Sequence, residues 1–202
     1  MKNIFQYTIC ALAALTLTAC GGGEGGSEVA GATDYIDREF TGVASSTTYS
    51  AWSGKTGASG AVYAGNSAGN NNTVQLRSNN SNSGIIVTKS AGKVSKVIVT
   101  WNSNTADGRT LDIYGKNTAY SAATDLYATD TRGTKLGSIV YGTSTELAIE
   151  GDYAFIGLRS NNGAMYLTQI QIVWGDGGEG GGDTPVTPTP LTMSTVSCTA
   201  QT

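Results

Sequence analysis

Two arginine residues stand in nearly the same context, VQLRSNN at residues 74–80 and IGLRSNN at residues 156–162. A catalytic interpretation makes Arg77 and Arg159 a substrate clamp. A structural interpretation makes each copy the same joint, in which a strand ends in a turn, because Asn side chains hydrogen-bond nearby backbone and tolerate left-handed conformations. Strand alternation directs both arginines outward. If the two strands are neighbours, Arg77 and Arg159 share one sheet face and could line a ligand site. We predict that each copy serves mainly as the end of a strand and the start of a turn, with a ligand site as the alternative.

Catalysis by the usual nucleophiles is excluded by composition, because the chain contains no His. This removes the commonest general base, the Ser-His and Cys-His pairs and nearly all catalytic zinc sites. Glycoside hydrolysis needs only two carboxylates. Three candidate pairs sit in polar, turn-like segments that are typical of solvated acids: Asp37 with Glu39, Asp125 with Asp130, and Glu150 with Asp152. We therefore predict that the protein is not an enzyme, with a glycosidase as the alternative.

Metal binding has one candidate. Acidic side chains near the first expected strand, Asp37 and Glu39, could meet Asp176 after the last one and hold a structural calcium ion. No other cofactor is expected, because the Gly-rich runs lack the Gly-Lys-Ser/Thr ending and the strand-to-helix setting of a phosphate-binding loop.

Sugar recognition is the remaining chemistry that the residue types fit. Aromatic faces stack on pyranose rings, and amide or guanidinium groups bind hydroxyls. Candidate ligand residues are Tyr49, Trp52, Tyr63, Arg77, Asn79, Asn80, Arg159, Asn161, Asn162 and Tyr166, with Tyr120 and Tyr127 as further aromatic candidates. The alternative for each aromatic residue is ordinary packing in a β domain.

The elements that must position these residues are strands. Period-2 alternation places Val97, Val99 and Trp101 on one face of 96–102, and Leu111 and Ile113 inward in 109–114. The same alternation sets Leu147 and Ile149 against Glu146 and Glu150, and puts Thr168, Ile170, Ile172 and Trp174 on one side of the last strand. No segment of comparable length after residue 19 keeps a helical period. We predict an all-β fold, an antiparallel β-sandwich that is jelly-roll-like.

The first twenty residues predict export. A basic start and a short apolar segment end in Leu17-Thr18-Ala19-Cys20, which resembles the lipobox of bacterial lipoprotein signal peptides. The resemblance implies that residues 1–19 are a signal peptide and that Cys20 is acylated and anchors the protein in a lipid bilayer. Gly21 is not the Asp of inner-membrane retention, so we expect a cell-envelope location, on the outer membrane and facing the exterior. The net charge of −3 and the lack of a basic stripe predict no nucleic-acid partner.

Composition divides the rest of the chain. Residues 20–32 are Gly-rich and predict a flexible tether, and residues 175–190 form a Gly/Pro-rich linker. Residues 33–174 are the expected β-sandwich domain. Residues 191–202 alternate like a first strand and resemble the opening of a fibronectin type III domain, so we expect them to be the truncated start of a further β domain.

The segments Leu111–Asn117, Phe155–Ser160 and Leu167–Trp174 resemble the galactose-binding-like jelly rolls of secreted bacterial enzymes and surface lipoproteins. Lys116 stands where that group often has Ser. The resemblance implies the fold and leaves the ligand open. We expect a non-catalytic surface module that binds carbohydrate or another extracellular polymer. The alternative is an architectural spacer or adhesin segment that presents a missing C-terminal domain.

Overall fold

Short strands separated by turns make up nearly all of residues 31–175, the part of the chain that the computed structural model describes. The strands are β1 (Thr33–Ile36), β2 (Ser50–Thr56), β3 (Val62–Ser67), β4 (Val74–Arg77), β5 (Gly84–Lys89), β6 (Val94–Trp101), β7 (Thr110–Lys116), β8 (Thr134–Val140), β9 (Glu146–Ala148), β10 (Phe155–Ser160) and β11 (Ala164–Trp174). The short helical segments among them are α1 (Arg38–Thr41), η1 (Asn70–Asn72) and η2 (Ala123–Tyr127).

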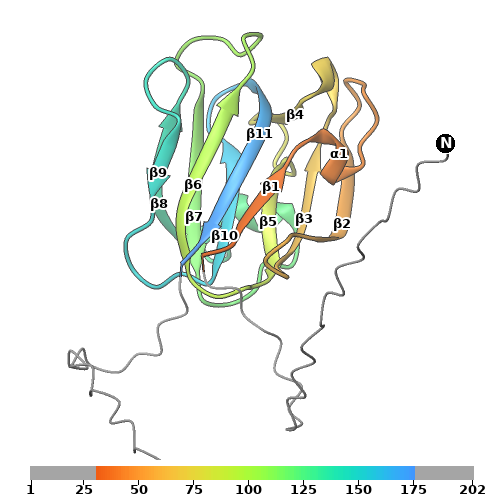
Figure 1. The fold of residues 1–202 in the computed structure, drawn as a ribbon. Helices are drawn as coiled ribbons and strands as arrows, with labels where there is room; N and C mark the ends of the chain where they lie inside the picture. Colours follow the sequence, from red (N-terminus) through yellow and green to blue (C-terminus); the bar gives the residue numbers. More distant parts are fainter. Residues whose placement is uncertain (1–30, 176–202) are drawn as a thin grey trace, which may run out of the picture.

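The strands form two antiparallel sheets that pack face to face (Figure 1). Sheet A has the order β1-β11-β6-β9, and β4 also pairs with β11. Sheet B has the order β2-β3-β5-β10-β7-β8. Most connections carry the chain from one sheet to the other, so strands that are distant in sequence become neighbours. The predicted antiparallel β-sandwich is confirmed.

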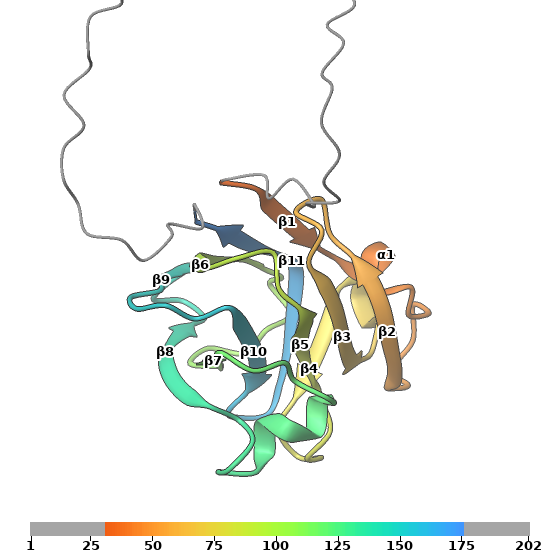
Figure 2. The same cartoon turned by 90° about the horizontal axis from the view of Figure 1, so that it is seen from below.

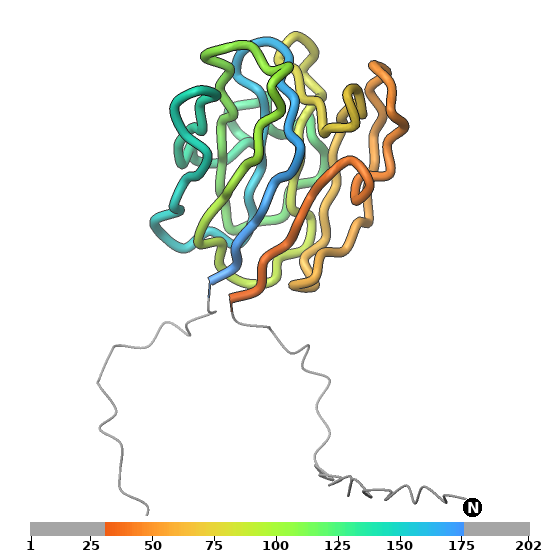
Figure 3. The backbone as a smooth tube through the Cα atoms, turned by 45° about the horizontal axis from the view of Figure 1, so that its top comes forward, coloured from red at the N-terminus to blue at the C-terminus, as the bar shows by residue number. Residues whose placement is uncertain are grey.

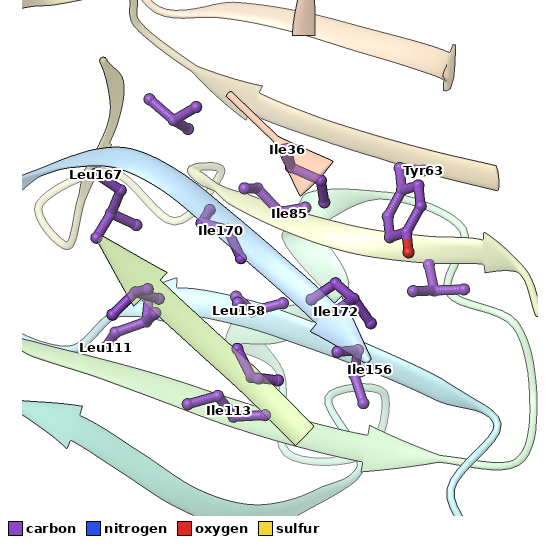
Figure 4. Close-up of a cluster of buried hydrophobic side chains, with 14 of the residues drawn as sticks. Ile36, Tyr63, Ile85, Leu111, Ile113, Ile156, Leu158, Leu167, Ile170 and Ile172 are labelled. Atoms are coloured by element: carbon purple, nitrogen blue, oxygen red, sulfur yellow. The ribbon is translucent and has the colours of Figure 1, made fainter. Parts of the chain in front are cut away.

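The main hydrophobic core lies between the sheets, where the inward residues of both meet (Figure 4). Ile85, Ile156 and Leu158 of sheet B face Ile170 and Ile172 of sheet A, and all five are at most 1% exposed. Alternation in the sequence placed Ile170 and Ile172 on the inward face correctly, because the side-chain period of a strand is a local property. Burial of each such side chain contributes roughly 1.5–3 kcal/mol to folding.

A second, smaller cluster covers the outer face of sheet B. Ala64, Ile86 and Tyr114 from three strands pack against Tyr120 and Leu126, which belong to the segment around η2. In Figure 2, η2 is the green helical turn on the side of sheet B away from sheet A. Strands β5 and β7 are consequently buried on both faces, although alternation predicted an outward, polar side for β7. Asp112 points outward as expected but is only 2% exposed.

One carboxylate ties the edges of the two sheets together. Asp34 of β1 is fully buried, and its oxygens accept hydrogen bonds from Trp174 Nε1 at 2.8 Å and Tyr63 Oη at 2.7 Å. Ser59, in the turn between β2 and β3, donates to the same carboxylate from its backbone N–H and its hydroxyl. These donors replace the water that an isolated buried carboxylate would lose.

The prediction for the last strand is wrong at one residue. Ile170, Ile172 and Trp174 are buried, but Thr168 is exposed and Leu167 is buried in its place. The pairing of β11 with β6 shifts register between Leu167 and Gln169. Such a bulge inserts one residue and reverses the alternation on its two sides. The alternation of inward residues that holds from Trp174 back to Ile170 therefore does not extend to Thr168.

The first and last strands of the described region pair with each other. Thr33 lies opposite Val173, and Trp174 N–H donates to the Ala32 carbonyl. The two coloured ends accordingly lie side by side in Figure 3. Among residues 31–175, no helix has the length and apolarity that crossing a membrane requires. The predicted signal peptide, the predicted lipidation site at Cys20, the predicted linker after Gly175 and the strand predicted over 191–202 lie outside the described residues.

Candidate functional site

The two repeated segments are the same joint, and they meet. Each ends a strand, β4 in sheet A and β10 in sheet B. Ser78 N–H donates to the Gly163 carbonyl at 3.2 Å, and Gly163 N–H donates back to the Ser78 hydroxyl at 2.7 Å. The copies thus fasten one end of the sandwich together. Because β4 and β10 lie in different sheets, the hypothesis that Arg77 and Arg159 share one sheet face is wrong.

A tyrosine of η2 nevertheless lies close to both arginines. The Tyr127 hydroxyl donates to the carbonyls of Arg77, at 3.3 Å, and Ser83, at 2.7 Å. The guanidinium carbon of Arg159 lies 4.9 Å from the centre of the Tyr127 ring. Burial raises the pKa of Tyr127, and the positive charge of Arg159 opposes that rise. The segment around η2 thereby links two predicted ligand residues that come from opposite sheets.

Arg77 also packs against Tyr49. The guanidinium carbon lies 3.7 Å from the Tyr49 ring centre, a distance at which cation–π attraction is effective. In the amide orientation that satisfies both of its ends, Asn80 accepts a 2.8 Å hydrogen bond from Arg77 Nη2 and donates to the Asn79 carbonyl. Burial raises the pKa of Tyr49, and its hydroxyl has no hydrogen-bond partner. Four predicted ligand residues, Tyr49, Arg77, Asn79 and Asn80, are therefore close together.

On the outer face of β10 and β7, charged groups surround Tyr114. The guanidinium carbons of Arg159 and Arg132 lie 5.4 and 5.5 Å from its ring centre. Asp112 is bound by Lys135 Nζ at 2.8 Å and by the Ser138 hydroxyl at 2.7 Å. We call Tyr114, Arg132, Lys135 and Arg159 the basic face.

A pocket of about 410 Å³ lies on the other side of η2, against β2 and β3. We call it the η2 pocket. Its lining residues are mostly small, and six are apolar and five polar: Ala51, Trp52, Ser53, Ala64, Gly65, Asn66, Asn82, Ser121, Ala122, Ala123 and Thr124. The side-chain oxygens of Asn66 and Asn82 are both buried, and neither accepts a hydrogen bond. An unpaired amide on a pocket wall is a group that a bound ligand can satisfy.

Two glycines allow η2 to approach sheet B. A Cβ atom on Gly157 would lie 2.3 Å from Leu126 Cδ2, and one on Gly84 would lie 2.6 Å from Leu126 Cδ1. The start of η2 is fixed by Asp125, whose carboxylate accepts the Ser121 N–H at 2.7 Å. The pocket therefore depends on a small residue in each of two central strands.

Several predicted ligand residues lie elsewhere. Tyr63 is 1% exposed in the main core and binds Asp34, which leaves it no free face for a sugar, so its assignment as a ligand residue is corrected. Trp52 is 9% exposed, donates its indole N–H to Ser67 and belongs to the main core, although it also lines the η2 pocket. The Gly- and Ser-rich segment between them forms most of β2, the turn after it and the start of β3.

The second Asn pair is structural. Asn162 accepts the Thr110 N–H at 2.8 Å and donates to the Gly108 carbonyl, and Asn161 N–H donates to the Thr110 carbonyl. Tyr166 pairs with Gln75 across β11 and β4.

The acids proposed for calcium do not form a cluster in the described residues. Asp37 caps α1 by accepting the Phe40 N–H at 2.8 Å, and Glu39 lies in the same short helix. Asp176 lies outside the described residues. Within 31–175, no three His, Cys, Asp or Glu side chains gather closely enough to hold a metal ion.

Sequence reasoning missed Asn66, Asn82, Tyr114 and Arg132. Nothing in their local sequence separates Asn66 or Asn82 from other asparagines, since their contact with η2 is set by the packing of distant segments. No protein-family model, no curated protein and no solved structure matches this chain. A functional proposal therefore depends on the residues of the site itself.

Proposed function

We propose that this chain is a non-catalytic lipoprotein module on the cell surface that binds carbohydrate, or another hydroxyl-rich extracellular polymer, in the η2 pocket. Acylated Cys20 holds it in the outer membrane with the sandwich facing the exterior. The support for the anchor is the Leu17-Thr18-Ala19-Cys20 segment.

The observation that carries the binding proposal is the pair of unsatisfied amides in the pocket. Asn66 and Asn82 both line a space of about 410 Å³, and the side-chain oxygen of each is buried without a donor among the described residues. That volume is within the range of small-ligand sites. A sugar hydroxyl both donates and accepts, so one ring can pair with the oxygen of one amide and the nitrogen of the other. Ala51, Ala64 and Ala122 leave room for the ring itself.

The placement of acids supports binding rather than turnover. No Asp or Glu belongs to the described lining of the η2 pocket. Of the acids considered for a catalytic pair, Asp37 and Asp125 cap helical segments, and Asp152 pairs with Lys93 at 2.6 Å. Hydrolysis of a glycosidic bond needs two carboxylates on either side of that bond.

Affinity electrophoresis of the full-length protein in gels that contain single polysaccharides tests the proposal. We expect retardation by at least one neutral polysaccharide, and Asn66→Ala or Asn82→Ala should weaken it about ten-fold, the value of one good hydrogen bond. Asn104→Ala is the matched control, because Asn104 is exposed and does not line the pocket. Retardation by no polysaccharide, or an equal loss in the Asn104 variant, would contradict the pocket and favour the architectural alternative.

The anchor has its own test. Cells that express the chain and are fed labelled palmitate should label the native protein and leave Cys20→Ala unlabelled. Label that persists in Cys20→Ala would refute acylation at that residue.

A further inference from the structure

Three arginines near η2 lie against tyrosine rings, and none has an acidic partner. Arg77 packs on Tyr49, Arg159 on Tyr127, and Arg132 on Tyr114. The ion pairs among residues 31–175 involve Arg38, Lys93, Lys96 and Lys135 instead. Nε of Arg77 and Nε of Arg159 are moreover buried without a hydrogen-bond partner. The positive charge on this side of the sandwich is thus left unneutralised by the described part of the protein.

The carboxylate paired across the strands with Arg159 does not compensate for it. Asp112 lies opposite Arg159 in the pairing of β10 with β7, but it makes its ion pair with Lys135 and a further hydrogen bond with Ser138. The basic face therefore carries three cations, Arg132, Lys135 and Arg159, around one buried acid. Both arginines contact the same Tyr114 ring, which keeps them within reach of one extended ligand.

Stacking on a ring leaves an arginine suited to anion binding. A guanidinium held beside an aromatic ring keeps the N–H groups that do not face the ring available as a planar fork. Such a fork binds a carboxylate or sulfate through two parallel hydrogen bonds. The neighbouring tyrosine also restricts the arginine side chain, so less conformational entropy is lost when an anion binds.

The basic face adjoins the η2 pocket. Asn82 lines the pocket, the next residue, Ser83, accepts a hydrogen bond from Tyr127, and Arg159 lies against the Tyr127 ring. The η2 pocket and the basic face are therefore joined through Ser83 and Tyr127 of the same packed segment.

We propose that the basic face binds the carboxylate or sulfate groups of an acidic polysaccharide, with Arg132 and Arg159 as the residues that distinguish it from a neutral one. This inference rests on the proposed function and names its ligand class. A nucleic acid is disfavoured because the whole chain has a formal charge of −3 and the cations are few and separated.

Matched pairs of polymers test the inference with the full-length protein. Dextran sulfate is compared with dextran, and polygalacturonate with its methyl ester, so that only the anionic group differs and sulfate is separated from carboxylate. We expect the acidic member of at least one pair to bind ten-fold or more tightly, with an affinity that falls as salt is added. Arg159→Gln and Arg132→Gln should each lower the ratio of the acidic to the neutral affinity about ten-fold. Arg159→Lys should recover only part, because an ammonium group keeps the charge without the fork.

Lys89→Gln is the control for net charge, since Lys89 is an exposed cation outside the basic face. A loss in Lys89→Gln equal to that in Arg159→Gln would mean unspecific attraction and would overturn the proposal. So would equal binding of the two members of both pairs, or binding of a single-stranded oligonucleotide as tight as that of the acidic polysaccharide. If neutral polysaccharides bind as well as acidic ones, and binding depends on Asn66 but not on Arg159, the inference about acidic ligands is wrong and the proposed function stands. Failure of every glycan to bind overturns the proposed function as well.

Discussion

Replacement of Asp34 by Ala is the most direct test of what holds the two sheets in register. The carboxylate accepts hydrogen bonds from Trp174 of sheet A, Tyr63 of sheet B and the turn at Ser59. Its removal leaves the indole N–H and the phenol hydroxyl buried, since Trp174 and Tyr63 are each 1% exposed. At roughly 1–3 kcal/mol for each stranded group, the loss is about 2–6 kcal/mol. A domain of this size has a total stability of only about 5–15 kcal/mol.

Asp34→Asn changes the hydrogen-bonding capacity of the side chain while it keeps nearly the same volume. The amide has the volume of the carboxylate but presents one NH₂ group. If that group faces Trp174, two donors meet, because the indole N–H cannot accept; if it is reversed, it faces the Ser59 backbone N–H instead. We therefore expect Asn to recover only part of the loss. Ser59→Ala removes a single hydroxyl donor from the edge of the network and should cost about 1 kcal/mol.

Urea unfolding of the full-length variants, followed by Trp fluorescence, measures these differences. The reasoning is refuted if Asp34→Ala loses less than about 1 kcal/mol, or if Asp34→Asn is as stable as the native protein. Either result would mean that the carboxylate is not needed to satisfy Trp174 and Tyr63.

Three further predictions concern other parts of the fold. Gly157→Ala should lower stability by about 1–3 kcal/mol and weaken glycan binding, because a Cβ there would overlap Leu126 and displace η2; unchanged binding in the affinity gel would contradict this origin of the pocket. Stability should fall as the pH rises above 10, because burial raises the pKa of Tyr63 above its ordinary 10.0 and the unfolded chain then ionises a phenol that the folded chain keeps neutral. Urea midpoints on both sides of that pH measure the effect, and Tyr63→Phe should reduce the slope. Asn71→Val should cost about 1–2 kcal/mol in the same assay and Asn71→Gly almost nothing, since Asn71 has φ of 54°.

The strands could be predicted from sequence because their side-chain period is local. Val97, Leu111 and Ile170 are buried as their alternation indicated. The exception at Thr168 arises from a bulge in the pairing of β11 with β6, and its trace in the sequence is the change of phase from Met165 and Leu167 to Ile170 and Ile172. Trp52, predicted as a ligand residue, instead packs in the main core, and Gly54 and Gly60, both with positive φ, accommodate an irregularity and a turn within its strand pair.

The candidate site was only partly accessible to the same reasoning. The repeat identified Arg77 and Arg159 as outward residues at strand ends, and both lie near Tyr127. Their assignment to one sheet face failed because strand order is a property of the whole fold. The cover that η2 forms over sheet B depends on the absence of side chains at Gly84 and Gly157, far away in sequence. Asn66 and Asn82 line a pocket only because η2 packs over sheet B.

Thr33 and Val173 are partners in one ladder, so their Cα atoms are separated by about 4.5–5.5 Å, the width of a strand pair. The polypeptide enters and leaves this sandwich through what is nearly a single point. Because its first and last strands are paired, the domain adds almost nothing to the distance between the segments that precede and follow it in the sequence.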